Sequence, residues 1–297
     1  MSLWTRYKDR FDLRGFFYVG PAFIFLLLIV IFPLFKVFQY SFQEYFDRSF
    51  VFTGLMNYQR LFSDELFWLS IKNTFIFTIG TIILHLVISW VIALLLNAKG
   101  PSLKVRNFFR GALLFPFLFS APAAALLWGI LYQPLGYPNY IIEQLFGTTI
   151  NFLGDPRYAL FSVLLVNLWT SFPLYMILIL GGLQSISKSM YEAARMDGAD
   201  WFQSLWHITL PQMRTLMMTI IVIDFATTFI HFDLVWTMTK GGPLRSTYLI
   251  SFFLYQRGMQ AFKFGYASAV GVIIALIVSA CVGPLVFFYS KRWEVKA

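Results

Sequence analysis

Six long runs of apolar residues dominate this sequence and decide which kind of fold it can adopt. They cover about residues 16–40, 69–97, 108–132, 159–184, 214–238 and 264–290. A helix needs about 20 residues to cross the hydrocarbon core of a bilayer, and each run is long enough. Charged residues make up only 12% of the 297 residues, against roughly 25% in soluble domains. The sequence therefore predicts an all-α membrane protein with six transmembrane helices, interrupted at Pro116, Pro122 and Pro173.

The distribution of Lys and Arg among the connecting segments predicts the orientation, because positively charged segments tend to stay in the cytoplasm. Fourteen cations lie on one side: Arg6, Lys8, Arg10, Arg14, Lys99, Lys104, Arg106, Arg110, Lys188, Arg195, Arg214, Lys291, Arg292 and Lys296. The loops of the other side hold seven: Arg48, Arg60, Arg157, Lys240, Arg245, Arg257 and Lys263. We therefore expect both termini, and the loop after the fourth run, in the cytoplasm. The fifth loop, which has four of the seven cations, fits this rule least well.

The loop between the fourth and fifth runs, residues 185–213, carries signals for two short helices. Two residue pairs have the spacing of a capping box, in which an N-cap side chain and a Glu or Gln three residues later bond each other's backbone: Ser189 with Glu192, and Asp200 with Gln203. Gly198 suits the left-handed residue that ends a helix. Pro211 is expected to mark the end of the second helix. The loop is therefore predicted to be a structured polar segment.

The sequence contains no motif for catalysis or metal binding. A phosphate-binding loop needs Gly-x-x-x-x-Gly-Lys followed by Ser or Thr, and residues 241–247 have no such Lys. Neither a His-Glu-x-x-His zinc motif nor a nucleophile elbow occurs. The single cysteine, Cys281, lies inside an apolar run and is interpreted as an inert packed thiol. A transporter built on this chain would therefore take its energy from a partner.

Polar residues inside the fourth and fifth runs mark a candidate substrate cavity, because polar groups are costly in a bilayer. Helical spacing places each set on one face of its helix: Asn167, Thr170, Ser171 and Tyr175 on the fourth, and Asp224, Thr227, Thr228 and His231 on the fifth. The simpler interpretation is that each Ser or Thr bonds its own helix backbone and holds helices together. For Asn167 and Asp224 the cavity is the favoured interpretation.

Such a cavity would suit a sugar, whose hydroxyl groups need hydrogen bonds and whose apolar face packs on aromatic rings. Rings are offered nearby by Trp128, Trp169 and Phe172. An ionised Asp224 would repel an anionic substrate unless it is paired, which favours a neutral sugar. His85 fits a packed, hydrogen-bonded histidine better than a ligand.

Several motifs resemble those of ABC importer permeases. Glu192-Ala193-Ala194, followed by Gly198 and by Ile208-x-Leu210-Pro211, resembles their cytoplasmic "EAA" loop. Three further segments are similar to the carbohydrate-uptake subgroup related to maltose and glycerol-phosphate permeases: Gly54-Leu55-Met56-Asn57-Tyr58 with Phe67-Trp68 and Asn73-Thr74, residues 232–243, and Tyr266-Ala267-Ser268-Ala269. Met238 stands where Leu is usual and Lys240 precedes the glycines, and neither departure disables the pattern.

The resemblance implies a type I ABC importer permease fold and a set of partners. Its ATPase-coupling residues would be Glu192, Ala193, Ala194, Asp197, Gly198 and Pro211. Expected partners are ATP-binding cassette subunits, a second permease subunit (a paralogue, in a heterodimer), an external solute-binding protein, a sugar substrate and the lipid bilayer, but no nucleic acid. The chain would bind no cofactor, ATP and Mg being used by the partner ATPase. It would be a multi-pass protein of a bacterial or archaeal plasma membrane.

This interpretation divides the chain into three parts. Residues 1–68 hold a cytoplasmic segment, the first span and the first outer loop; residues 69–290 hold a permease core of five spans with the loop at 185–213; residues 291–297 form a cytoplasmic tail. The predicted function is import of a sugar or oligosaccharide by alternating access, driven by ATP. The alternative is an ion-coupled secondary transporter in which Asp224 and His231 relay protons, although no inverted repeat supports it.

Overall fold

The computed structural model describes residues 13–46, 49–98 and 102–294, which are predominantly helical. Some cations used to predict the orientation lie outside the described residues: Arg6, Lys8, Arg10, Arg48, Lys99 and Lys296. Among the described residues, five helices are long and apolar enough to cross a membrane, and a bent helix pair makes a sixth span if it counts as one. The chain divides into two compact units, Met1–Asp64 with Leu254–Ala275, and Glu65–Phe253 with Leu276–Ala297. The division of the chain at residues 68 and 290, expected from the sequence, stays a prediction.

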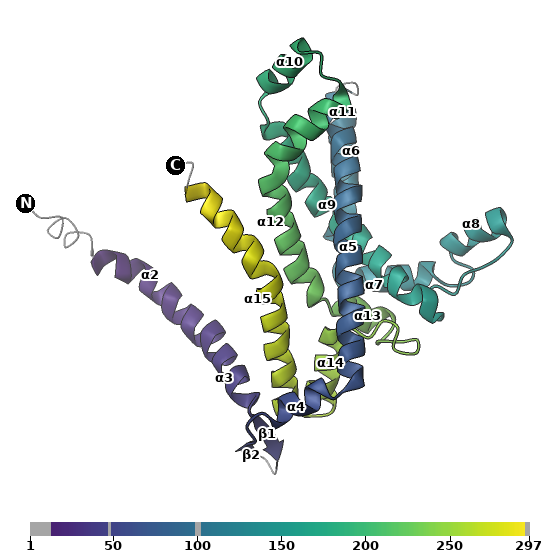
Figure 1. Cartoon of the computed structure of the whole chain (residues 1–297). Coiled ribbons are helices and arrows are strands. Elements are labelled where there is room, and N and C mark those ends of the chain that lie inside the picture. The colour runs from purple at the N-terminus through teal and green to yellow at the C-terminus, as the bar shows by residue number, and fades with distance from the viewer. Residues whose placement is uncertain (1–12, 47–48, 99–101, 295–297) are drawn as a thin grey trace, which may run out of the picture. The chain divides into compact units, whose positions relative to one another are not determined.

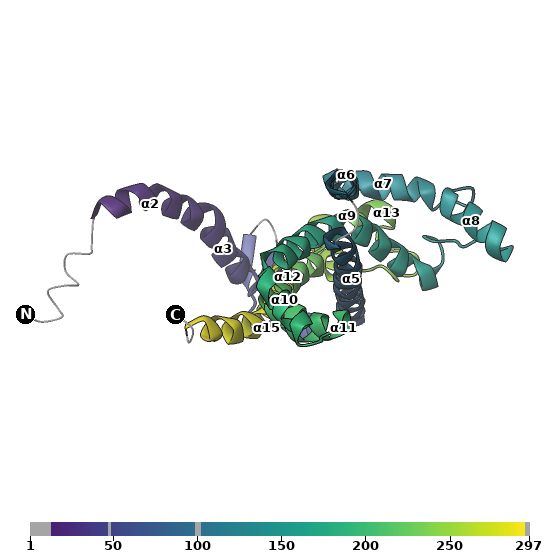
Figure 2. The same cartoon turned by 90° about the horizontal axis from the view of Figure 1, so that it is seen from above.

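The larger unit is organised around three long helices, α5 (Glu65–Asn97), α9 (Pro156–Ser185) and α12 (Leu210–Phe229). Helices α5 and α9 run side by side, and α12 contacts both (Figures 1 and 2). Their shared core is apolar and includes Ala93, Phe172, Met176, Ile179, Leu180, Leu183, Met213 and Ile220. Pro173 lies inside the continuous α9, so the predicted interruption there is wrong. A membrane helix tolerates the missing N–H when its neighbours pack tightly.

A buried stripe of small polar residues runs along α5, and the sequence analysis did not identify it. Its members are three or four residues apart: Ser70, Thr74, Thr78, Thr81, His85 and Ser89. The Ser89 hydroxyl donates to the carbonyl of Phe172 on α9 over 3.0 Å. Small polar residues let membrane helices approach closely and bond across the interface. The regular spacing within residues 69–97 was the signal that could have revealed this stripe.

The third apolar run forms a bent pair of helices instead of one straight span. Helix α6 (Leu103–Leu114) continues into the 3₁₀ turn η2 (Phe115–Leu118), and α7 (Ala121–Leu131) follows at an angle of 97°. The interruptions predicted at Pro116 and Pro122 are therefore confirmed, and the run counts as one span only as a bent pair. Pro116 tightens the end of the first part, and Pro122 occupies the first turn of α7, where Ser120 caps the new helix. Helix α8 (Tyr137–Phe146) continues away from α5, α9 and α12 (Figures 1 and 2).

The fifth apolar run begins earlier than expected and breaks before its expected end. Helix α11 (Trp201–Ser204), the π-helical turn η3 (Leu205–Thr209) and α12 follow one another without interruption. Pro211 therefore lies in the first turn of α12, and the prediction that it ends a helix is wrong. The break comes after Phe229, and the short helix α13 (Asp233–Met238) follows. The loop after α13 is held by Asn73 on α5, whose amide donates to the carbonyls of Arg245 and Tyr248.

The smaller unit joins the first apolar run to a compact segment of two strands and a short helix. Helix α2 (Leu13–Leu26), the π turn η1 (Leu27–Ile31) and α3 (Phe32–Tyr40) lead into the antiparallel strands β1 (Gln43–Phe46) and β2 (Ser49–Phe52), with Gln43 paired to Phe52. Helix α4 (Met56–Phe62) follows. From the other end of the chain come the end of α14 (Ile250–Tyr255), the π turn η4 (Gln256–Gln260) and the start of α15 (Phe264–Glu294).

The motif Gly54-Leu55-Met56-Asn57-Tyr58 stabilises this smaller unit. Gly54 has a φ of +60°, a left-handed conformation that favours glycine. The buried Asn57 amide donates to the carbonyls of Ser41 and Gln43, over 3.1 and 2.8 Å. The Tyr58 hydroxyl donates to the Ser41 hydroxyl over 2.7 Å. The motif therefore fixes the turn that follows α3 against α4.

Candidate functional site

The segment that joins α9 to α12 contains a short exposed helix, α10 (Lys188–Met196). Its N-cap is Ser187, whose hydroxyl lies 2.7 Å from that of Ser189. The predicted capping box of Ser189 with Glu192 is therefore wrong, because the helix begins before Ser189 and places that residue inside its first turn. Figure 1 shows α10 beyond the ends of α9 and α12.

The C-terminal end of α10 is fixed by a glycine turn. Gly198 has a φ of +80°. The backbone N–H of Gly198 donates to the Arg195 carbonyl over 3.1 Å, and that of Ala199 donates to the Ala194 carbonyl over 2.9 Å. This pair of bonds is a Schellman motif, which satisfies the last carbonyls of a helix. The prediction that Gly198 ends the first helix is confirmed.

A second set of bonds ties this turn to α12. The Asp200 carboxylate accepts from the Gln203 backbone N–H over 2.7 Å, and the Gln203 side chain accepts from the Asp200 N–H over 2.9 Å. The predicted capping box is therefore present. The Tyr191 hydroxyl lies 2.9 Å from that of Thr209 in η3 and joins α10 to the helix that leads into α12. Sequence reasoning missed this pair, because its members are 18 residues apart.

The exposed face of this segment mixes polar and apolar side chains. Glu192, Ala193 and Asp197 are exposed, and Ala194 is half-buried. Five larger apolar side chains are also exposed: Met190, Met196, Trp201, Phe202 and Trp206. Between this segment and the ends of α5 and α9 lies a groove of about 1020 Å³. Contiguous apolar surface on a polar segment indicates contact with a partner or with lipid.

A cluster of buried polar groups lies where α5, α9 and α12 meet. Asp224 on α12 is fully buried, and its Oδ2 lies 2.9 Å from Nδ1 of His85 on α5. The Thr228 hydroxyl donates to Oδ1 of the same carboxylate over 2.9 Å. The ring of Tyr175 on α9 packs against the His85 ring, with centroids 4.8 Å apart. His85 is thus a packed, hydrogen-bonded histidine, as predicted.

The structure brings only some of the predicted cavity residues together. Asp224, Thr228 and Tyr175 gather around His85, whereas Thr170 and Thr227 donate to carbonyls of their own helices. Asn167 is buried on α9 and Ser171 is half-buried. Thr170 and Thr227 therefore fit the simpler interpretation, in which the hydroxyl bonds its own helix backbone.

His231 does not join the Asp224 cluster, because it follows the end of α12. Its ring stacks on that of Phe77, with centroids 6.1 Å apart, and its carbonyl accepts from the Ser251 hydroxyl. Its Nε2 atom is buried and has no hydrogen-bond partner among the described residues. The predicted aromatic group is partly assembled: Trp128 and Trp169 contact each other at 5.8 Å, while Phe172 lies in the apolar core.

Comparison with known proteins defines the class to which this fold belongs. Residues 13–294 match the family described as "Binding-protein-dependent transport system inner membrane component". The chain is 32% identical to the probable ABC transporter permease protein YurN of Bacillus subtilis, over 89% of this chain and 92% of that protein. It is 29% identical to the trehalose/maltose transport system permease protein MalF of Thermococcus litoralis, over 93% and 94% of the two chains.

Among solved structures, a bacterial ABC transporter that imports the acidic polysaccharide alginate contains a similar chain, with a TM-score of 0.83 and 22% identity. The match covers 97% of this chain and 98% of that one. This protein therefore belongs to the family of inner-membrane components of binding-protein-dependent transport systems, and it is a multi-pass membrane protein with the ABC importer permease fold.

Proposed function

We propose that this chain is the permease subunit of an ATP-driven importer that moves a sugar or oligosaccharide across the membrane by alternating access. The exposed α10, which ends at the Gly198 turn, carries the proposal, because it presents Glu192 and Ala193 at the end of the bundle while the Tyr191–Thr209 contact ties it to η3, which leads into α12. Helix-in-groove docking is a common mode of recognition between proteins. The sugar class is supported by the similarity to a trehalose/maltose permease.

In this proposal α10 and the turn after it bind the ATPase subunit. The coupling residues are Glu192, Ala193, Ala194, Asp197, Gly198 and Pro211. Closure of the ATPase pair displaces α10, and the contacts through Thr209 transmit the displacement to α12. The sequence has no phosphate-binding loop, so ATP and Mg are used by the partner and this chain holds no cofactor. The loop then faces the cytoplasm, with both termini on the same side.

The proposed substrate cavity lies beside the Asp224 cluster. Asn167, Ser171 and Tyr175 offer polar groups from α9. The Asp224 carboxylate already accepts from Thr228 and lies beside His85. It therefore acts in our proposal as a positioning group between α5 and α12. Because Asp224 is fully buried and already bonded, the preference for a neutral sugar rests on the similarity to the trehalose/maltose permease.

No observation favours the alternative of an ion-coupled secondary transporter. That mechanism needs Asp224 and His231 to exchange protons, and in the structure Asp224 bonds His85 instead. The comparisons give no support for it.

Reconstitution of the complete transporter tests the proposal. The chain is purified with the ATPase and second permease that accompany it, and sugar uptake is measured with and without ATP and the external binding protein. We expect uptake to need both, to survive a protonophore, and to fall at least tenfold in Glu192→Ala while ATP hydrolysis continues. Uptake by the lone chain that a protonophore abolishes would overturn the proposal.

A further inference from the structure

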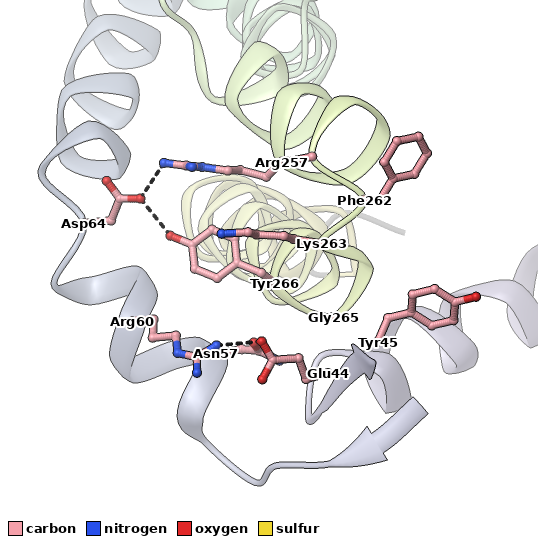
Figure 3. A pocket seen from close by; sticks show the side chains of 11 residues that line it. Glu44, Tyr45, Asn57, Arg60, Asp64, Arg257, Phe262, Lys263, Gly265 and Tyr266 are labelled. Atoms are coloured by element: carbon pink, nitrogen blue, oxygen red, sulfur yellow. Dashed lines mark hydrogen bonds and ion pairs between the residues drawn. The ribbon is translucent and has the colours of Figure 1, made fainter. Parts of the chain in front are cut away.

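The smaller unit contains a charged pocket of about 380 Å³ that the proposed function leaves without a role (Figure 3). It lies between α4 and β1 on one side and the segment from η4 to the start of α15 on the other. In the proposed orientation these segments belong to the first and fifth outer loops. We name it the outer pocket.

Three cations and two carboxylates line the outer pocket. Arg257 pairs with Asp64 at 2.9 Å, and the Tyr266 hydroxyl donates to the same Oδ2 over 3.0 Å. Arg60 pairs with Glu44 at 2.8 Å. The Lys263 ammonium makes no ion pair with any carboxylate among the described residues, and in the view of Figure 3 it lies between the two pairs. The pocket therefore has one cation in excess.

The backbone around the outer pocket is tightly constrained. A Cβ at Gly265 would collide with the Gln43 carbonyl, so α15 approaches β1 as closely as only glycine allows. Phe262 has a φ of +53°, which an aromatic residue rarely adopts. Backbone strain of this kind is concentrated at binding and active sites. The left-handed backbone of Phe262 places its ring, which is 65% exposed, at the rim of the pocket.

We propose that the outer pocket receives the carboxylate of an acidic side chain from the external solute-binding protein, with Lys263 as its ion-pair partner and Phe262 and Tyr45 as apolar contacts. This inference rests on the proposed function and its orientation. Aromatic residues and Arg are the side chains that dominate protein–protein interfaces. Arg60 and Arg257 are already neutralised by partners within the pocket, which leaves Lys263 to recognise the incoming charge.

The size of the pocket favours a side chain over a saccharide. Small-molecule sites occupy about 300–1,000 Å³, so 380 Å³ is at the lower limit and would not hold an oligosaccharide. An acidic side chain needs only one cation and a polar wall, both of which are present.

The test measures ATP hydrolysis by the reconstituted transporter at increasing concentrations of the binding protein. We expect Lys263→Glu to raise the half-saturating concentration about tenfold and to reduce its salt dependence, because a like charge then faces the partner's carboxylate. Lys263→Arg keeps the charge, and its half-saturating concentration should therefore stay close to that of the unchanged protein. The matched control is Arg245→Glu, which reverses an exposed cation on the fifth loop outside the pocket.

Three results would overturn the inference. One is an unchanged half-saturating concentration in Lys263→Glu, and another is an equal rise in Arg245→Glu, which would show only a general effect of charge. The third is a shift in preference between acidic and neutral saccharides without a change for the binding protein, which would make the pocket a sugar site. If the binding protein does not stimulate the unchanged transporter at all, the proposed function itself fails.

Discussion

The proposed coupling loop, residues 185–213, and the Asp224 cluster are both polar, yet they are built in opposite ways. The loop of α10 and α11 is exposed and is fixed by local bonds, including the Gly198 turn and the Asp200–Gln203 capping box. The Asp224 cluster is fully buried, and its bond to His85 spans 139 residues of sequence. Local bonds shape a surface that a partner can move, whereas the buried bond holds helices together. Substitutions in the two regions should therefore fail in different ways.

The largest effect is expected from Asp224→Ala, which leaves His85 buried without its partner. Leaving a buried hydrogen-bonding group without its partner costs about 1–3 kcal/mol. We expect a lower temperature of thermal unfolding in detergent, followed by tryptophan fluorescence, and a lower yield from membranes. Adding His85→Ala should cost less than the sum of the single changes, because the two groups interact directly.

Thr227→Ala is the matched control for stability, since Thr227 is exposed and bonds its own helix. It should change the free energy of unfolding by no more than about 0.5 kcal/mol. Equal destabilisation by the two substitutions would show that the His85–Asp224 contact has no special role.

In the coupling loop, Gly198→Val should impair function more than stability. A β-branched residue at a φ of +80° is strained by about 1–2 kcal/mol, which displaces the turn after α10. We expect uptake to fall about tenfold while ATP hydrolysis persists. Gly181→Val is the control, because Gly181 is an exposed helical glycine whose Cβ would meet open space. Loss of membrane insertion in Gly198→Val would contradict the separation of the two regions.

Tyr191→Phe should have a smaller effect, because it removes one hydrogen bond to Thr209. A typical bond of this kind contributes about 0.5–1.5 kcal/mol. We expect uptake per ATP hydrolysed to fall about two- to fivefold, while the protein yield stays unchanged. Tyr140→Phe on the exposed face of α8 should leave this ratio as it was. An unchanged ratio in Tyr191→Phe would remove the proposed link between α10 and α12.

The smallest effect concerns Asp155, the N-cap of α9. The hydrogen bond from the Arg157 side chain lowers the pKa of the Asp155 carboxyl below 3.8. A lowered folded-state pKa adds stability above the unfolded pKa, and this contribution disappears as the pH falls through the folded value. The difference in unfolding temperature between the unchanged protein and Asp155→Ala should therefore shrink below pH 3.8. If the difference in unfolding temperature grew as the pH falls, it would contradict a lowered pKa of the Asp155 carboxyl.

Much of the fold could be predicted from the sequence, because membrane spans are encoded by long apolar runs. The runs located α5, α9 and α15 well, and the Gly198 and Asp200 signals located the ends of the loop helices. Pro116 and Pro122 indicated where the chain breaks between α6 and α7, but not how sharply the two helices bend. Hydropathy does not distinguish a straight span from two helices joined by Pro116 and Pro122.

The candidate site was less predictable, because it depends on contacts between distant segments. The sequence marked Asp224 as a costly polar group. That His85 is its partner follows only from the packing of α5 against α12. The pair Tyr191–Thr209 and the outer pocket likewise join residues whose sequence spacing carries no pattern. Helical periodicity placed Thr227 and Thr228 beside Asp224, yet it could not tell which of the two bonds the carboxylate.

The central claim is that α10 binds the ATPase subunit, and site-directed cross-linking tests it most directly. A cysteine is introduced as Ala193→Cys in a Cys281→Ser background, and a second variant carries Tyr140→Cys on α8. The assembled transporter is treated with a short bifunctional thiol reagent, with single cysteines introduced on the surface of the ATPase subunit. We expect a cross-link to the ATPase from position 193 and none from position 140. A cross-link from position 140 alone, or none from position 193 in a transporter that hydrolyses ATP, would contradict it.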